Sequence, residues 1–573
     1  MSYKGARAVV LITVATVFLA PAALADLGPT PGPLAQGAVP PPAYGGLPTA
    51  AYQGLFAGQE AWAPHGTVVA DSGFRPYPNG FSFTNYGVDM RVNQVLFAQP
   101  TALPAGGQPT LAVAMDSTTM RQTFGNGVCL PGQNLSKTSG CNLTQSAQVV
   151  QDLAAGWGAG GHCYGLSTMA AAFFNGQLNP GDLSTGAVNS LTTLNDTAQR
   201  TIMRALVAQY FSATGTRPSS MADAITTLRS VLTPGHVPVT LLIYGPVGGH
   251  ALTPFAVLDK GNGLFDIAVY DSNIPNQMRA VHVDTVNNNW QYLGAIDPTS
   301  ANALSWDSAQ PKTSLLLGSI DNSVKVQNCV FCQNNNSQSV VSFSPVSSTN
   351  AGLYDNIKLL TADGQPLDPK AYVLIPPTNP TVGGLVQGPV LRVNYGTAYA
   401  ISISGAAVEN RQPFAVTVVG KGSTQSVSLG AVTPDTSAQV TVGALSRSVA
   451  VVGKSFQTAS VAQTTEQAGV SYKFSATQQS ADNAGNVYSR VIANKKEVVF
   501  RDIQGKATNW TVRISSANNK GKSAYIATGV YTPAGTVLEV EYPTWKGAAG
   551  RPHLYLYSAI GGKKIRELPL TKA

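Results

Sequence analysis

The spacing of apolar and polar residues changes along the chain, and these changes separate a helical region from several β-rich ones. Residues 160–176 begin with a glycine-rich turn and end at Gly176, a typical helix stop. Between them the apolar residues recur at the spacing of one helical face: Leu166, Met169, Ala170, Phe173 and Phe174. This pattern predicts a helix that starts at Cys163.

The residues after this helix are first helical and then alternate as strands do. Two further amphipathic helices are expected over residues 193–211 and 219–232, the second capped by Ser219 or Ser220. Strands are expected over residues 238–244, 250–258 and 264–270, the last two joined by a Lys-Gly-Asn-Gly turn. Upstream, the alternation of Phe81 and Phe83 predicts a strand with one buried face.

From about residue 340 onward, short β-prone runs alternate with Gly, Pro and Asn turns. This pattern favours β-sandwich, Ig-like modules, with a division near residue 458. The expected fold class is therefore α+β: a domain with a helical part and an antiparallel sheet over residues 63–335, then β-sandwich modules over 336–458 and 459–573, the last one basic.

Composition points to a secreted protein. Only 11% of the 573 residues are charged, against about 25% in an ordinary domain. Lys4 and Arg7 precede an apolar run, and Ala23-Leu24-Ala25 has the small-residue pattern of a signal-peptide cleavage site. We expect residues 1–25 to be a signal peptide cleaved after Ala25, and residues 26–62, rich in Pro, Gly and Ala, to be a linker. No later segment predicts a membrane span.

Five cysteines are present, so one is left over if the others pair. An oxidising compartment favours a disulfide between Cys129 and Cys141 and a second between Cys329 and Cys332. A metal site at Cys329 and Cys332 is the alternative, although no second pair of ligands accompanies it. Cys163 is the remaining thiol. It lies where the first turn of a helix stabilises a thiolate, although a buried cysteine is often only a small apolar residue.

A reactive thiolate needs a base, and the base needs an orienting partner. Of six histidines, His250 is the best placed, because it opens a strand between small residues. If Gly261 and Asn262 form the loop, the hairpin places His250 opposite Asn273 and diagonal to Asp271 on the same face. A register slip of one residue would bring Ser272 there instead. His282 is the fallback base, and His162 is expected to be structural.

These motifs resemble the papain-like cysteine peptidase superfamily, especially its secreted bacterial and archaeal branches. The resemblance covers about residues 63–300. It includes Gly-Gly-His-Cys-Tyr-Gly-Leu before a helix, Gly-His-Ala at a strand start and Val-Tyr-Asp-Ser-Asn-Ile-Pro at the next strand end. It implies a papain-like fold in which Cys163 is the nucleophile, His250 the base and then the acid, and Asp271 the orienting residue, with Asn273 as its substitute.

The chain departs from this family at one position. Papain carries an oxyanion-hole Gln six positions before its cysteine, and Trp157 occupies that position here. The backbone N–H of Cys163 can supply one donor to an oxyanion. Gln151 or Asn85 is the candidate for the second donor.

The sequence therefore predicts a secreted hydrolase that cleaves peptide bonds through a thioester and needs no metal or organic cofactor. Two alternatives remain: a transglutaminase-like acyltransferase or cell-wall amidase with the same triad, and a non-enzymatic adhesion protein that acts through its β-modules. The expected partner is a polypeptide substrate. The basic C-terminal residues are interpreted as a solvated face, or else as a site for an acidic cell-surface polymer, because no nucleic-acid motif accompanies them.

Overall fold

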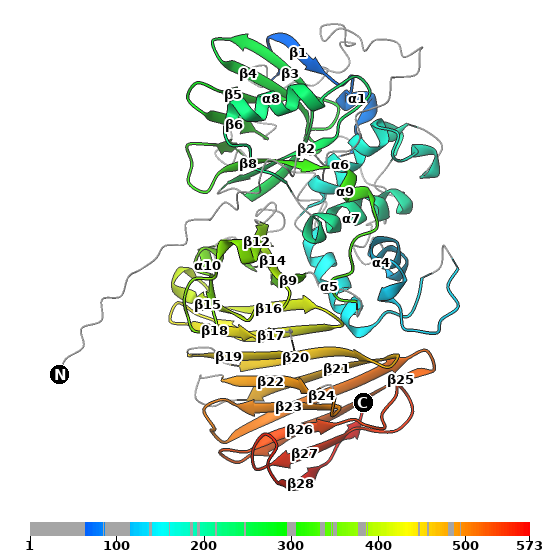
Figure 1. The fold of residues 1–573 in the computed structure, drawn as a ribbon, viewed down its shortest axis with the longest axis vertical. Helices are drawn as coiled ribbons and strands as arrows, with labels where there is room; N and C mark the ends of the chain where they lie inside the picture. Colours follow the sequence, from blue (N-terminus) through cyan, green and yellow to red (C-terminus); the bar gives the residue numbers. More distant parts are fainter. Residues whose placement is uncertain are drawn as a thin grey trace, which may run out of the picture.

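The structure is a computed structural model. It describes residues 63–83, 85, 115–136, 140–159, 161–183, 187–191, 195–212, 215–245, 248–294, 305–332, 338–344, 346–347, 352–375, 385–386, 388–444, 447–454, 458–479, 486–492 and 494–573. The signal peptide and linker expected over residues 1–62 lie outside this range. The described part is a mixture of helices and mainly antiparallel sheets, with the helices and one sheet above a long β-sandwich (Figure 1).

Among the described residues, five helices of eight or more residues form the helical part. They are α4 (Ser117–Phe124), α5 (Gln145–Ala159), α6 (Cys163–Phe174), α7 (Asp196–Phe211) and α8 (Met221–Val231). Single-turn helices also occur at α1 (Pro76–Asn79), α9 (Asp321–Val324) and α10 (Gly352–Asp355). The three helices predicted from residue 163 onward are confirmed as α6, α7 and α8, and the predicted cap Ser220 accepts a hydrogen bond from Asp223 N. Helices α4 and α5 were not predicted.

An eight-stranded antiparallel sheet lies beside the helices, in the order β7-β6-β5-β4-β3-β2-β8, with β1 also paired to β3. Its strands are β1 (Thr67–Asp71), β2 (Val239–Gly245), β3 (Gly248–Gly261), β4 (Leu264–Tyr270), β5 (Met278–Asp284), β6 (Asn289–Leu293), β7 (Ser305–Asp307) and β8 (Ser314–Ser319). The three predicted strands are β2, β3 and β4. Helix α6 packs directly against β3, which brings the predicted nucleophile and base onto facing elements.

The hairpin of β3 and β4 differs from its prediction at the turn. Its two loop residues are Asn262 and Gly263, both with positive φ, and not Gly261 and Asn262. An Asn-Gly pair is the usual choice where both turn residues need positive φ. Two register shifts between the turn and Thr253 absorb the difference, so that Thr253 pairs with Tyr270 as predicted.

The strand predicted around Phe81 and Phe83 is wrong. Both residues belong to an irregular segment, and their rings lie 5.2 Å apart, centroid to centroid. Phe81 is fully buried against the ring of Phe173 on α6. The alternation therefore came from aromatic residues anchoring a loop on the helix that carries Cys163.

The C-terminal half forms two large antiparallel sheets. One contains β11 (Lys358–Thr361), β15 (Tyr399–Ser404), β18 (Ser437–Val442), β19 (Ser448–Lys454), β22 (Val487–Ile492), β23 (Glu497–Asp502), β26 (Val537–Glu541), β27 (His553–Tyr557) and β28 (Lys564–Leu568) in that order. The other contains β12 (Tyr372–Ile375), β14 (Val390–Asn394), β9 (Gln338–Phe343), β16 (Gln412–Gly420), β17 (Ser423–Val432), β20 (Thr458–Gln467), β21 (Val470–Gln479), β24 (Thr508–Asn518), β25 (Gly521–Thr532) and β29 (Thr571–Lys572). A separate two-stranded ribbon pairs β10 (Val346–Ser347) with β13 (Leu385–Val386).

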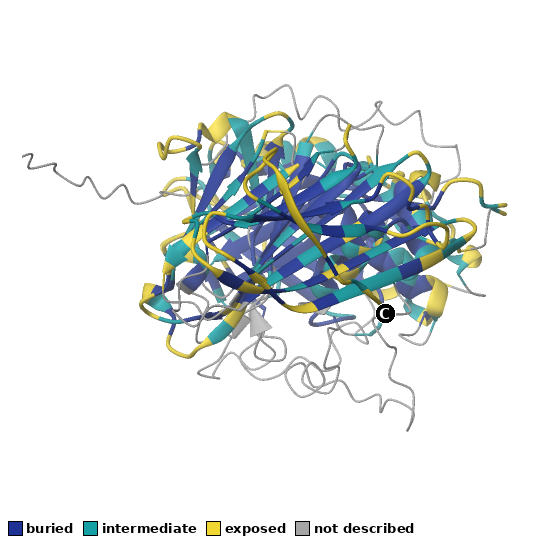
Figure 2. Ribbon diagram, turned by 90° about the horizontal axis from the view of Figure 1, so that it is seen from below, coloured by how far each residue is buried: buried dark blue, intermediate teal, exposed yellow. Residues whose placement is uncertain are grey.

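Both sheets continue across the boundary expected at residue 458. Strand β17 pairs with β20, and β19 pairs with β22, so each sheet joins the two expected modules. One hydrophobic core extends from Val341 to Leu568. Seen from the sandwich end, buried positions alternate with exposed ones along the strands (Figure 2). The two halves therefore share their sheets and their core.

Helix α5 connects the sandwich to the turn that carries Cys163. Near its start, the backbone N–H of Gln145 donates to Ser471 Oγ at 2.6 Å, and the Ser146 hydroxyl lies 2.8 Å from that of Thr464. Near its end, the buried indole of Trp157 donates to Ser342 Oγ at 3.2 Å. A core of helical and sandwich side chains fills the junction, including Trp157, Tyr210, Cys163, Val340, Val390 and Val419.

Candidate active site

Cys163 is the first residue of α6, as the glycine-rich turn predicted. Gly161, two residues earlier, has a φ of +114°, a conformation that other residues rarely adopt. Cys163 is the unpaired cysteine, and only 1% of its surface is exposed. Because first-turn N–H groups have no acceptor within their helix, the backbone at Cys163 presents donors and the positive end of the helix dipole to the thiol.

His250 enters the site from β3, opposite Ile243 of β2. Its Nε2 atom lies 2.7 Å from Oδ1 of Asp271, and both side chains are buried. The indole of Trp306 stacks on the imidazole at 5.7 Å between centroids and donates to the carbonyl of Gly248 at 2.9 Å. The ring of His250 is thus held on one edge by a carboxylate and on one face by an indole.

The protonated form of His250 is stabilised by its neighbours. Burial alone would lower the pKa of this residue, but the charge and hydrogen bond of Asp271, with a smaller contribution from Cys163, raise it to about 10. The second ring nitrogen, Nδ1, is buried and has no nitrogen or oxygen partner among the described residues. Cys163 lies close enough to raise the pKa of the imidazole, so its sulfur is the group that Nδ1 can face.

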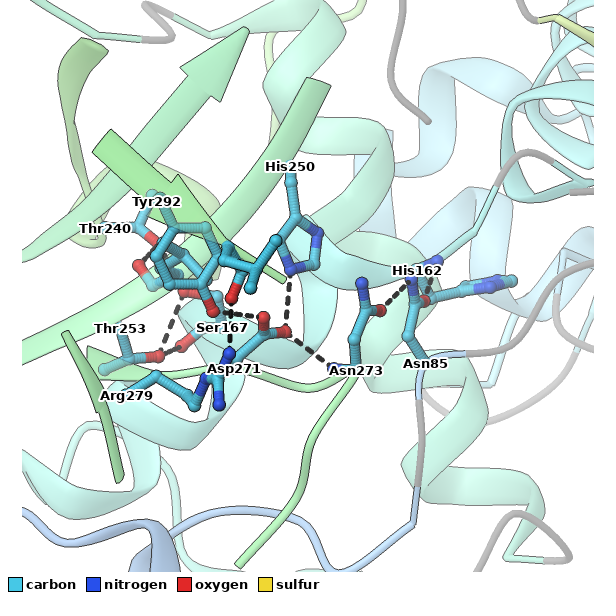
Figure 3. Close-up of polar contacts among 12 residues, drawn as sticks. Asn85, His162, Ser167, Thr240, His250, Thr253, Asp271, Asn273, Arg279 and Tyr292 are labelled. Carbon is cyan, nitrogen blue, oxygen red and sulfur yellow. Dashed lines mark hydrogen bonds and ion pairs between the residues drawn. The ribbon is translucent and has the colours of Figure 1, made fainter. Parts of the chain in front are cut away.

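The carboxylate of Asp271 accepts three hydrogen bonds from described residues. Besides His250, the backbone N–H of Asn273 donates to its Oδ1 at 2.7 Å, and the hydroxyl of Tyr292 donates to its Oδ2 (Figure 3). Burial opposes ionisation of Asp271, but the charge and hydrogen bonds of His250, with Tyr292 and Asn273, hold its pKa below the usual range. Burial and the charge of Asp271 also raise the pKa of Tyr292, so its hydroxyl stays protonated and able to donate.

Asn85 links the cysteine turn to the aspartate turn. Its Oδ1 accepts the backbone N–H of His162 at 2.6 Å, and its Nδ2 donates to Oδ1 of Asn273 at 3.1 Å. Its own backbone N–H donates to the carbonyl of Ser272 at 2.8 Å. An added Cβ at Gly161 would lie 3.1 Å from Nδ2 of Asn85, so the small residue before His162 lets the amide approach.

Two other predicted candidates, Gln151 and His282, lie elsewhere, and His162 has the structural role expected of it. The amide of Gln151 on α5 donates to the carbonyl of Met115 at 2.7 Å. His282, the fallback base, lies 2.7 Å from Asp266, a separate pair on β5 and β4. The buried ring of His162 packs beside Gly158, where an added Cβ would lie 3.1 Å from its Nε2. The structure therefore gathers Cys163, His250, Asp271, Asn273 and Asn85, and not Gln151 or His282.

The other four cysteines form the two expected disulfides, Cys129 with Cys141 and Cys329 with Cys332. Within the described part of the chain, no group of three His, Cys, Asp or Glu residues could hold a metal ion. Over the same residues, no helix has the length and apolar character needed to cross a membrane. At the basic C-terminus, Lys564 pairs with Glu541 at 2.9 Å and lies 3.4 Å from the centre of the Tyr555 ring.

Sequence reasoning missed Tyr292, Trp306 and Arg279. Buried Arg279 lies near Tyr292, where its charge works against the rise in the pKa of the Tyr292 hydroxyl. Its Nη2 donates to the carbonyl of Leu293 at 2.6 Å. These residues come from β5, β6 and β7, and no local motif marks them. Only the strand order places them around Asp271.

Comparisons with known proteins leave the site to be interpreted from its geometry. No family model, no curated protein and no solved structure matches the chain.

Proposed function

We propose that the protein is a secreted cysteine peptidase with a papain-like catalytic unit. The observation that carries the proposal is the 2.7 Å contact between His250 Nε2 and Asp271 Oδ1, on a sheet that packs against the helix starting with the unpaired Cys163. A nucleophile at a helix start, a histidine and an orienting carboxylate are the parts that thiol-dependent acyl transfer needs.

In the proposed reaction, the Cys163 thiolate attacks the carbonyl carbon of a peptide bond. The protonated His250 then gives its Nδ1 proton to the departing amine, and a thioester remains on Cys163. Water then attacks the thioester carbonyl and loses a proton to His250. The C–S bond breaks with its electrons on sulfur, and the carboxylic acid product leaves, which restores the thiolate and the protonated imidazole. Asp271 keeps the imidazole in the tautomer that directs Nδ1 to the sulfur, because its carboxylate holds Nε2–H.

Secretion is part of the proposal. The two disulfides fit an oxidising compartment, where such bonds persist. The sequence of residues 1–25 supports it independently through its signal-peptide pattern.

The experiment compares two histidines that each lie 2.7 Å from an aspartate in the same sheet. Casein hydrolysis and iodoacetamide labelling of Cys163 are measured in the wild type, Cys163→Ala, His250→Ala and the control His282→Ala. We expect hydrolysis to disappear in the first two variants and to persist in the third. Hydrolysis that persists in Cys163→Ala would refute the proposal. Adding a primary amine probe to the same assay tests whether the acyl group passes to an amine. Replacing casein with purified peptidoglycan tests whether the substrate is a cell-wall amide.

A further inference from the structure

The amide of Asn273 is buried beside the proposed triad, and half of it is unused. Asn273 is 1% exposed, and its Nδ2 atom has no hydrogen-bond partner among the described residues. Its other polar atoms are engaged, since Oδ1 accepts from Asn85 and the backbone N–H donates to Asp271. A buried donor without an acceptor is costly, and because this one lies beside the proposed triad, a ligand atom bound there would satisfy it.

The orientation of this amide follows from the network and does not depend on how its atoms are named. The backbone N–H of His162 can only donate, so the atom of Asn85 that meets it must be the oxygen. The Asn85 nitrogen then faces Asn273 and requires an oxygen there. The NH₂ group of Asn273 is therefore the end left without a partner among the described residues.

The position of this NH₂ group relates it to the cysteine turn and to the base. Through Asn85, the Asn273 amide is one hydrogen-bonded step from the backbone of His162, the residue before Cys163. The backbone N–H of Asn273 donates to Asp271, which places this residue one further step from the imidazole of His250. In Figure 3 the Asn273 amide lies between His250 and the backbone of His162, with its nitrogen directed to the side of the imidazole ring.

We propose that Nδ2 of Asn273 is the second donor of the oxyanion hole, alongside the backbone N–H of Cys163. This inference rests on the proposed function. When the thiolate forms the C–S bond, the π electrons of the carbonyl move onto its oxygen, and both donors stabilise the negative charge. On collapse, the C–N bond breaks, its electrons leave with the nitrogen, and the nitrogen takes the proton from His250. A donor already in place at the developing charge is the most effective kind.

This assignment changes the role of Asn85. The sequence made Asn85 a candidate donor, but both ends of its amide are occupied by His162 and Asn273. Asn85 is instead a positioning residue that fixes the Asn273 amide. With Asn273 as the second donor, no donor is needed at position 157, where papain carries its oxyanion-hole Gln and this chain has Trp157, bonded to Ser342.

The test separates stabilisation of an oxyanion from reactivity of the thiol. Acylation by p-nitrophenyl acetate passes through an oxyanion, whereas alkylation by iodoacetamide displaces iodide and does not. Both rates are measured on the full chain for the wild type, Asn273→Ala, Asn273→Asp and Asn85→Asp. Asn85→Asp keeps the acceptor for His162 and loses the donor that orients Asn273. Ser272→Ala is the matched control, because Ser272 is equally buried and its hydroxyl has no partner among the described residues.

We expect acylation to fall about 10²–10³-fold in both Asn273 variants, the usual loss for one oxyanion donor, and alkylation to stay within about twofold. Asn85→Asp is expected to show a smaller fall, and Ser272→Ala none. Acylation within about threefold of the wild type in Asn273→Ala would overturn the assignment, and so would a parallel loss of both rates. If Asn273→Ala does not fold, as judged by thermal unfolding, Asn273→Asp decides by the same criteria. If Cys163→Ala is acylated as fast as the wild type, it is the proposed function that fails.

Discussion

Asp271 lies one residue beyond the end of β4, yet its Oδ1 atom is 2.7 Å from Nε2 of His250 on β3. The two are joined by a hairpin whose register shifts bring the pairing at its base to Thr253 with Tyr270. Asp271 therefore leaves the sheet at the point where its carboxylate can turn back to the imidazole and also accept the backbone N–H of Asn273.

Replacing Asp271 with Asn should slow hydrolysis and change its pH dependence. Asp271 raises the pKa of His250 to about 10, so the imidazole stays protonated through neutral pH and, in the proposed reaction, can donate to the leaving amine. In Asp271→Asn the decline of amide hydrolysis at high pH should begin at a lower pH. Its maximum should fall about 10²-fold or more, the range of general acid–base catalysis. Rate profiles from about pH 5 to 11, which span the ordinary and raised pKa of histidine, check this, and an unchanged high-pH limb would contradict it.

Replacing His250 with Gln should lower stability most at mildly acidic to neutral pH. The folded pKa of His250 is raised from 6.5 to about 10, so its contribution to stability is complete below pH 6.5 and is lost as the pH rises through 10. We expect a cost of about 3–5 kcal/mol near pH 6, typical when one partner of a buried pair is removed. Urea unfolding of wild type and variant at about pH 6 and about pH 10 measures the difference. A gap that widens toward the higher pH would contradict the expected sign.

Gly165→Ala should separate α6 from α7. An added Cβ at Gly165 would lie 2.2 Å from the backbone oxygen of Ile202, a contact that only movement of the helices can relieve. We expect a loss of about 1–3 kcal/mol in unfolding free energy, as for other overpacked cores. Gly156→Ala on α5 is the matched control, because nothing lies within 4 Å of its added Cβ. That variant should gain about 0.5–1 kcal/mol, since alanine is the better helix former. Equal effects of the two substitutions would exclude the packing explanation.

The two disulfides should contribute unequally to stability. Cys129 and Cys141 are separated by 12 residues, whereas Cys329 and Cys332 are separated by only 3. A longer closed loop restricts the unfolded chain more, so replacing both Cys129 and Cys141 with Ala should cost about 2–4 kcal/mol. The paired substitution at Cys329 and Cys332 should cost less. Thermal unfolding of the two double variants compares them, and the reverse order would count against the loop-length argument.

The sequence predicts the site well where short-range rules determine geometry. The 3.6-residue spacing after Gly161 predicted α6, and the hairpin brought His250 to Asp271 although its turn was misplaced by one residue. Both depend on residues that are near one another in the chain. The unexpected turn at Asn262 did not spoil the prediction, because register shifts within the strands compensated.

Features that depend on distant pairing could not be predicted in this way. Tyr292 and Trp306 reach Asp271 and His250 only through the order of strands in the sheet. At Phe81 and Phe83 the prediction failed in the other direction. Their two-residue spacing suggested a strand, but the two rings anchor a loop. The continuity of the sandwich depends on β17 meeting β20 and β19 meeting β22, and turn residues alone do not show which neighbours meet.

Helix α5 is anchored on the sandwich through Ser471 and Ser342 and ends just before the turn that holds Cys163. Its last turns share a core with both halves of the chain. Cutting the chain after the second disulfide would therefore leave the Trp157 side chain facing water in place of Ser342. We expect the helical part and the sandwich to melt in one cooperative transition, so that Cys163 keeps its place in the candidate site only for as long as the sandwich beneath it stays folded.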